Sequence, residues 1–196
     1  MRLILLPLML AASLLPATAA TNPKVWGSPA APITIELFSD FQCPGCRQLH
    51  MTTIQAALKD CVAKGKVQIV HRDFPLPQHQ YAKLAARYAN ASAPLGLYQK
   101  VCDQLFLTQP AWEKTGKVDA AVAQVVGAAD MAKIRAAIKD PHIDDEMNRD
   151  TSLGAQAKLT GTPSMVLSYK GKRYPPITGV VSYDVLSKIV DSLLKQ

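Results

Sequence analysis

Beyond its first twenty residues, this 196-residue chain lacks any apolar run long enough to cross a membrane. A spanning helix needs about 20 consecutive apolar residues, so we expect residues 21–196 to be soluble. The chain also lacks internal repeats and low-complexity segments. Its length suits one domain with an insertion and allows a sizeable core without disulfides.

The chain has few aromatic residues (6%) and no block of basic ones, although 22 basic and 15 acidic residues give it a net charge of +7. The lysines and arginines are scattered in ones and twos, and no aromatic stripe runs between them. Solvated surfaces explain this pattern better than a polyanion does. We therefore expect no nucleic-acid partner.

The one long apolar stretch stands at the N-terminus, in MRLILLPLMLAASLLPATAA. Arg2 gives a positive start, residues 3–15 are apolar, and residues 17–19 form a small-x-small cleavage pattern. We expect residues 1–20 to be a signal peptide cut after residue 19 or 20, and an uncleaved anchor is the alternative. No cysteine stands at the cut, which disfavours a lipid anchor. The mature protein is then periplasmic or otherwise exported.

The remaining sequence alternates between strand and helix character around an alanine-rich middle. β-branched and apolar runs predict strands, and Pro and Gly separate the helical segments. We expect strands over residues 33–38, 67–70, 164–169 and 173–174, and helices over about 47–63, 80–92, 96–107, 118–127, 131–139, 143–159 and 185–194. This order predicts one α/β unit with a helical insertion.

Only four cysteines are present, and two of them form the motif CPGC at residues 43–46. A structural zinc site needs four ligands at close spacing, and the other cysteines and the histidines are dispersed. A purely structural bridge between Cys43 and Cys46 closes a very short loop, which gains little stability. A dithiol that opens and closes is the third interpretation, and we favour it because the motif joins a buried strand to a helix.

That context gives the first cysteine a specific chemistry. Free N–H groups and the helix dipole at a helix N-terminus favour an anion, so the pKa of the Cys43 thiol is expected to fall. Pro44 suits the first helical turn, and Cys46, one turn deeper, would resolve a mixed disulfide. Arg47 either adds positive charge near the thiolate or points to water.

Four segments together resemble the DsbA-like thioredoxin family of exported thiol–disulfide oxidoreductases. They are GSPAAP at residues 27–32, SDFQCPGC at 39–46, RDFPL at 72–76 and GTP at 161–163, in matching order. The resemblance implies a thioredoxin fold with an inserted helical domain, with residues 21–76 and 160–196 as the thioredoxin-like part and 77–159 as the insertion. It also implies that Thr162 and a cis Pro163 lie beside the CPGC and bind the substrate backbone.

Two positions depart from the family pattern. Members often carry His at the position of Gly45, and many carry an acidic residue at the position of Leu37. The nearby Glu36 faces the other side of the strand if that strand is regular. We therefore expect a Cys43 less acidic than in a strong oxidase, and the direction of exchange stays open between oxidant, reductant and isomerase.

Cys61 and Cys102 form the second pair. A bridge between them would enclose 41 residues (102 minus 61) and be worth about 4 kcal/mol in the chain-entropy model. The alternative is two buried free thiols, because free Cys packs well in cores. An exported location favours the bridge.

The sequence thus predicts an exported thiol–disulfide oxidoreductase that needs no cofactor or metal. Its partners would be cysteine-containing exported proteins and a redox-recycling protein, which could be membrane-bound, and we expect a monomer. The alternative is a redox-inactive or metal-holding binding module on the same fold.

Overall fold

The computed structural model of the protein describes residues 24–196. The expected signal peptide, residues 1–20, lies outside this range. Within it, no helix has the length and apolar content that a bilayer crossing requires.

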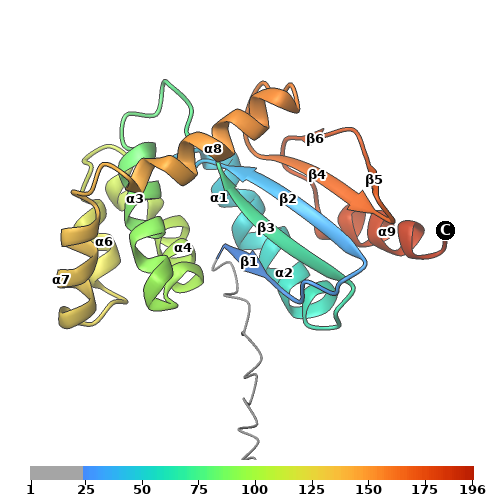
Figure 1. Ribbon diagram of the computed structural model, residues 1–196, viewed down its shortest axis with the longest axis horizontal. Helices are drawn as coiled ribbons and strands as arrows, with labels where there is room; N and C mark the ends of the chain where they lie inside the picture. Colours follow the sequence, from blue (N-terminus) through green and yellow to red (C-terminus); the bar gives the residue numbers. More distant parts are fainter. Residues whose placement is uncertain (1–23) are drawn as a thin grey trace, which may run out of the picture.

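One mixed sheet organises the described residues (Figure 1). Its strands are β1 (Val25–Trp26), β2 (Ile33–Ser39), β3 (Val67–Asp73), β4 (Ser164–Tyr169), β5 (Lys172–Arg173) and β6 (Ile177–Thr178). The order across the sheet is β1–β3–β2–β4–β5, and β6 also pairs with β4. β2 and β3 run parallel, while the other paired strands are antiparallel. The strand that leads to the CPGC is therefore central.

β2 buries one whole face and the end of the other. Successive side chains of a strand point to opposite faces. Ile33, Ile35 and Leu37 enter the main core, and Phe38 lies on the other face in a small cluster with Leu159 and Val166. Glu36 is also on that second face, where it binds Arg72 and Arg173, so it points away from the cysteines as expected.

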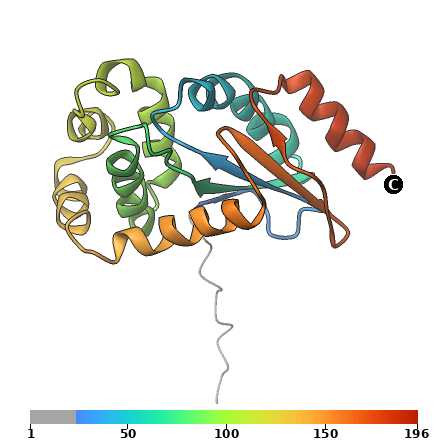
Figure 2. The same ribbon diagram turned by 90° about the horizontal axis from the view of Figure 1, so that it is seen from above.

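Helices cover both faces of the sheet (Figure 2). One face carries a continuous helical stretch and the C-terminal helix, and the other carries α8. Their bounds are α1 (Pro44–Leu49), η1 (His50–Ile54), α2 (Gln55–Ala57), η2 (Leu58–Val62), α9 (Tyr183–Leu194) and α8 (Ile143–Gln156). The segments η1 and η2 are π-helical. The first helix thus begins directly after Cys43, three residues earlier than residue 47.

The chain between β3 and β4 is helical and gathers beside the sheet (Figure 1). Besides α8 it contains α3 (Ala82–Ser92), η3 (Ala93–Leu95), α4 (Tyr98–Leu107), α5 (Gln109–Trp112), α6 (Val118–Ala123) and α7 (Ala128–Ala137). The expected helices in this segment are all present. The sequence did not predict α5, β1 or β6, because elements of two to four residues are too short to show a period.

A buried charged cluster ties α8 to the sheet, and the sequence did not reveal it. Lys24, 1% exposed, places Nζ 2.6 Å from Oδ2 of Asp73 in β3 and 2.6 Å from Oδ2 of Asp150 in α8. Arg72 joins the cluster through Asp150 at 3.0 Å, and the amide of Asn90 donates to Asp73 at 2.8 Å. Burial of these charges is tolerated because they are paired and hydrogen-bonded.

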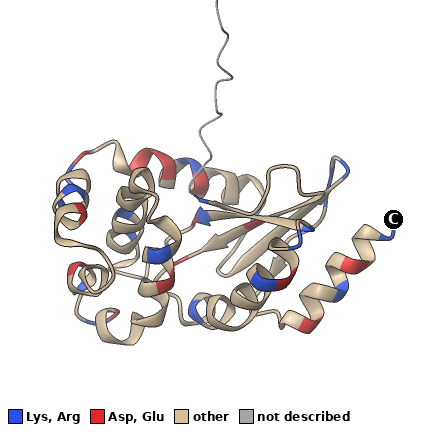
Figure 3. Cartoon of the chain, turned by 90° about the horizontal axis from the view of Figure 1, so that it is seen from below, with Lys and Arg blue, Asp and Glu red and all other residues tan. Residues whose placement is uncertain are grey.

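Charges on the surface are interspersed. In the view of Figure 3, basic and acidic residues alternate along several helices of the described chain. Several of these opposite charges form exposed ion pairs, such as Arg135 with Asp119 and Lys188 with Asp184.

Candidate active site

Cys43 stands at the junction between the central strand and the first helix. After β2 ends at Ser39, three residues lead to Cys43, which is the N-cap of α1 with an extended backbone (φ −75°, ψ 123°). Pro44 takes the first helical position, where its missing N–H costs nothing. The expected placement of a thiol at a helix N-terminus is therefore what the structure shows.

The surroundings of Cys43 lower the pKa of its thiol from 9.0 to about 5. The largest cause is a hydrogen bond from the Cys46 thiol. Burial acts in the opposite direction and raises the pKa. The Thr162 hydroxyl and the backbone N–H groups of Cys46 and Gly45 lower the pKa further. Because all of these donors stabilise the anion, Cys43 is a thiolate at neutral pH. Redox-active cysteines in such motifs have pKa values of about 3.5 to 7.5, so Cys43 is acidic without being at the extreme.

Cys46 has the opposite character. Its side chain is 1% exposed, and burial together with the neighbouring Cys43 raises the pKa of its thiol well above 9.0. The backbone N–H of Asp40 donates to its Sγ at 3.4 Å. The two sulfurs therefore form an asymmetric pair, in which Cys43 carries the charge and Cys46 carries the proton.

Thr162 and Pro163, which are 119 residues or more from Cys43 in sequence, lie against the motif. The peptide bond between them is cis. When it is protonated, the Cys43 thiol donates to the carbonyl oxygen of Thr162 at 3.5 Å. The Thr162 hydroxyl is buried without a hydrogen-bond partner in the neutral site and contributes to lowering the pKa of both thiols, so it is available to donate when Cys43 ionises.

Gly45 makes room for this contact. A Cβ added at Gly45 would lie 3.3 Å from Cδ of Pro163, 3.7 Å from Sγ of Cys43 and 3.7 Å from Cγ2 of Val180. The motif is thus packed closely against the loop that carries Pro163. A side chain at this position would require Pro163 to shift by a few tenths of an ångström. Val180, 42% exposed, adds an apolar side chain at the rim.

Arg47 does not act as the sequence suggested. Its Nε donates to the carbonyl oxygen of Phe106 in α4 at 3.0 Å. Arg47 is not among the main causes of the low Cys43 pKa. The guanidinium instead connects the first helix to α4. Arg47 therefore matches neither expectation, a charge beside the thiolate or a side chain in open water.

Cys61 and Cys102 are both buried free thiols, so the expected bridge is not formed. The two sulfurs have different surroundings: Cys61, in η2, lies 3.9 Å from the Tyr183 hydroxyl, whereas Cys102, in α4, lies beside Tyr98. Burial raises the pKa of both thiols, which makes them poor nucleophiles. The structure therefore corresponds to the alternative of two packed thiols.

Asp40 shapes the segment before the motif, and the sequence analysis missed it. Its buried carboxylate accepts hydrogen bonds from the N–H of Gln42 at 2.7 Å, the N–H of Leu76 at 2.8 Å and Nδ1 of His79 at 2.7 Å. The first of these closes a turn in which an Asp side chain binds the backbone two residues on. The available signal was an Asp directly after a strand, since Asp side chains often bind the backbone N–H two residues on and so form a turn.

In residues 24–196, no group of three or more His, Cys, Asp or Glu side chains is arranged to hold a metal ion. The chemistry of the site lies in the sulfur pair and its hydrogen-bond donors. A polarised dithiol of this kind can exchange disulfide bonds with another cysteine-bearing molecule.

Comparisons with known proteins agree with this geometry. The family model described as Thioredoxin matches residues 19–192. A curated relative, the probable disulfide bond formation protein D of Bacillus cereus, is 22% identical over 183 residues, which are 91% of this chain and 82% of that protein.

Two solved structures show the same fold. The alpha-DsbA1 structure of Wolbachia pipientis matches with a TM-score of 0.73 and 20% identity over 87% of this chain and 89% of that one. Oxidised BdbD of Bacillus subtilis matches with a TM-score of 0.73 and 20% identity over 88% of this chain and 93% of that one. The expected thioredoxin fold with a helical insertion is confirmed, and the chain belongs to the thioredoxin family as a DsbA-like member, in a group of thiol–disulfide oxidoreductases.

Proposed function

We propose that this protein is an exported thiol–disulfide oxidoreductase that exchanges disulfides with client proteins through Cys43 and Cys46. The observation that carries the proposal is the geometry of the asymmetric pair: Cys43 is the N-cap of α1 with its Sγ 3.5 Å from the Thr162 carbonyl oxygen, and Cys46 is buried one turn deeper. These surroundings lower the pKa of Cys43 to about 5 and raise that of Cys46 well above 9.0. An acidic thiol with a protonated thiol beside it is what a mixed-disulfide mechanism needs.

The exchange runs in two displacements. A client thiolate attacks Sγ of Cys43 in the oxidised protein, a client–Cys43 bond forms, and the Cys43–Cys46 bond breaks. Cys46 leaves as a thiolate and takes up a proton, because its burial disfavours the charge. A second client thiolate then attacks the client sulfur of the mixed disulfide, and Cys43 leaves as a stabilised thiolate. The client gains a disulfide, and the protein keeps the two electrons as its dithiol.

The acidity of Cys43 favours the oxidant direction. Groups that stabilise the thiolate stabilise the reduced protein, which makes the disulfide form the stronger oxidant. In addition, a thiol of low pKa is a good leaving group in the second displacement. Among the three directions that the sequence left open, disulfide donation to clients is the one that the site supports.

The client backbone is expected to bind beside Thr162 and Pro163, which carry the substrate-binding role. An extended client segment can pair strand to strand with exposed backbone at such a loop. Exposed Val180 would offer an apolar contact next to the reacting sulfur. The clients would be exported proteins with cysteines, and a redox-recycling partner would reoxidise the dithiol.

Export rests on residues 1–20, which we propose are a signal peptide, so the mature chain would act in the periplasm or outside the cell. We also propose residues 21–76 and 160–196 as the thioredoxin-like domain, residues 77–159 as the helical insertion, and a monomer as the active form.

Trapping tests the proposal. The oxidised protein is mixed with reduced ribonuclease A, and the recovery of ribonuclease activity is followed. In a separate reaction, reduced Cys46→Ser is mixed with scrambled, disulfide-bonded ribonuclease: Cys43 attacks a ribonuclease disulfide, one ribonuclease thiolate leaves, and the mixed disulfide should accumulate because the resolving thiol is gone. In the first assay, Cys61→Ala should recover activity like the unmodified protein. If ribonuclease is not reoxidised and no mixed disulfide forms, the alternative of a redox-inactive binding module replaces the proposal.

A further inference from the structure

Gln109 links the helical insertion to the backbone of the active-site motif. It begins α5 and is 1% exposed. Its Nε2 donates to the carbonyl oxygen of Phe41 at 2.6 Å and to that of Cys43 at 3.1 Å. Both hydrogens of the amide are thereby used on two carbonyls that flank Gln42. No sequence motif identifies this contact, since the partners lie 68 and 66 residues apart.

Gln42 makes the reciprocal connection. Its Nε2 donates to the carbonyl oxygen of Glu113, just past α5, at 2.8 Å. Its Oε1 accepts a hydrogen bond from the backbone N–H of Tyr81 at 2.6 Å. The segment before α1 and the segment around α5 therefore hold each other through side chain–backbone hydrogen bonds from both sides.

These bonds fix the peptide groups on both sides of the reacting residue. The N–H of Cys43 donates to the carbonyl oxygen of Asp40 at 3.1 Å, and its own carbonyl accepts from Arg47 N–H at 3.1 Å as well as from Gln109. With its backbone held at both ends, Cys43 keeps Sγ facing the N–H groups that open the first helical turn.

We propose that Gln109 is a positioning residue for disulfide exchange, which holds the Cys43 backbone in the geometry that stabilises the thiolate. This inference rests on the proposed function, and it places part of the control of the active site in the helical insertion. Removing the amide would take the donor from the buried Phe41 carbonyl oxygen and leave the Cys43 carbonyl with the Arg47 N–H alone. Because an unmet buried acceptor is costly, the loop would shift or admit water, and the alignment of the donors on Sγ would loosen.

Two substitutions and a matched control test this role. Gln109→Met keeps the length and burial of the side chain without a donor, and Gln109→Asn keeps the amide but is too short to reach both carbonyls. Gln104→Met is the control, because Gln104 is also a buried glutamine of the insertion, with its Nε2 bound to Gln124 at 2.9 Å. Melting temperatures show whether each variant folds.

The readouts are the pH dependence of iodoacetamide alkylation of Cys43 in the reduced protein and the redox equilibrium with glutathione. Gln109→Met should raise the midpoint of alkylation by about one pH unit, a tenfold change in the thiolate equilibrium, and should make the protein a weaker oxidant. Gln109→Asn should give a smaller change in the same direction. Gln104→Met should leave both readouts unchanged.

The inference is overturned if folded Gln109→Met and Gln109→Asn keep the midpoint and the equilibrium constant of the unmodified protein, or if Gln104→Met shifts them equally. Should the Met variant fail to fold, the Asn variant decides by itself. Alkylation of Cys43 needs no client, so a failure of client exchange would remove the proposed function without deciding this test.

Discussion

Replacing Lys24 by Met should destabilise the protein strongly, although Lys24 lies far from the cysteines in the sequence. The substitution removes a buried ammonium group and leaves the carboxylates of Asp73 and Asp150, which are 1% and 0% exposed, without the cation that touches both. Breaking a buried ion pair from one side costs about 3–5 kcal/mol, because the remaining charge stays buried.

The remaining hydrogen bonds place the expected loss at the lower end of that range. Asp150 keeps Arg72 at 3.0 Å and the N–H of Asp73 at 3.1 Å, and Asp73 keeps the Asn90 amide at 2.8 Å. We expect the free energy of unfolding to fall by about 3 kcal/mol. For a chain of this size, that corresponds to a melting temperature lower by about 6–12 °C.

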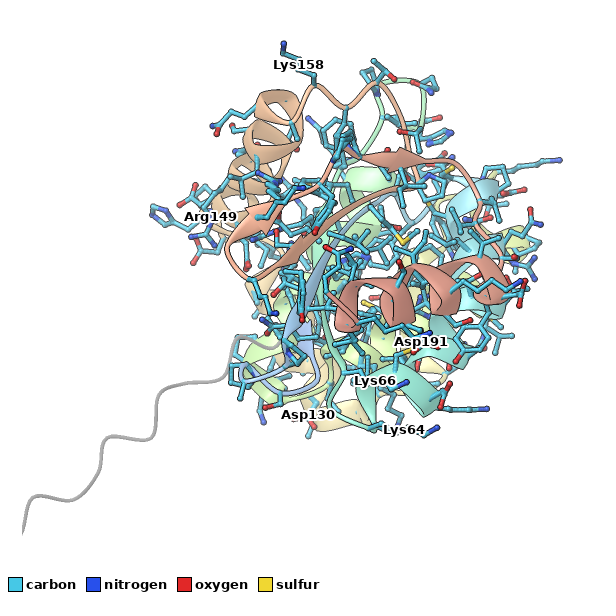
Figure 4. The ribbon with its side chains drawn as sticks, turned by 90° about the vertical axis from the view of Figure 1, so that its right-hand side faces the viewer. Lys64, Lys66, Asp130, Arg149, Lys158 and Asp191 are labelled. Atoms are coloured by element: carbon cyan, nitrogen blue, oxygen red, sulfur yellow. The ribbon has the colours of Figure 1, made fainter. Side chains whose placement is uncertain are left out.

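Urea unfolding at pH 7, followed by the fluorescence of the two tryptophans, measures the change. Lys66→Met is the matched control, because Lys66 and Asp191 form an exposed pair at 3.0 Å (Figure 4), and exposed pairs contribute little. Adding Asp73→Asn to Lys24→Met should recover part of the loss, since it removes one uncompensated carboxylate. A Lys24→Met midpoint equal to that of the Lys66→Met control would refute the reasoning.

Three further predictions concern other parts of the structure. Thr162→Val should raise the pKa of the Cys43 thiol by about half a unit, because one donor to the thiolate is lost. Alkylation profiles check this, and an equal effect of Thr162→Ser would contradict it. Denaturing alkylation of the oxidised protein should label both Cys61 and Cys102, and a mass spectrum without these two adducts would mean that they are bridged. Gly154→Ala should lower the free energy of unfolding by about 1–3 kcal/mol despite the better helix propensity of Ala, because its Cβ would overlap the Phe74 ring. Urea unfolding measures this, and a higher midpoint for the variant would contradict it.

The sequence predicted those parts of the molecule that depend on local pattern. The apolar run of β2, the CPGC and the start of a helix are contiguous, so the place of Cys43 at a helix N-terminus followed from neighbouring residues. The position of Thr162 beside Cys43 required the family resemblance, since no local pattern connects residues 119 apart.

The rest depended on which distant groups meet in three dimensions. From the same position in the first helix, the Arg47 side chain could reach either the thiolate or α4. The packing of α4 against that helix decides between the two. In the sequence, Lys24 looks like a solvated residue in an extended lead-in. In the structure it is buried, and its ammonium group pairs with carboxylates from β3 and α8. Gln109 lies in a helix of four residues, too short to be read from a period, so its contact with the motif could not be predicted.

Titration of the reduced protein tests the central claim most directly, because the ultraviolet absorbance of a thiolate reports the ionisation of Cys43. A Cys43→Ala variant supplies the baseline. The structure predicts a midpoint near pH 5, with thiolate lost as the pH falls through that value and no second thiol ionising below pH 9. A midpoint at about 8.5, the value of an unperturbed cysteine, would contradict the account.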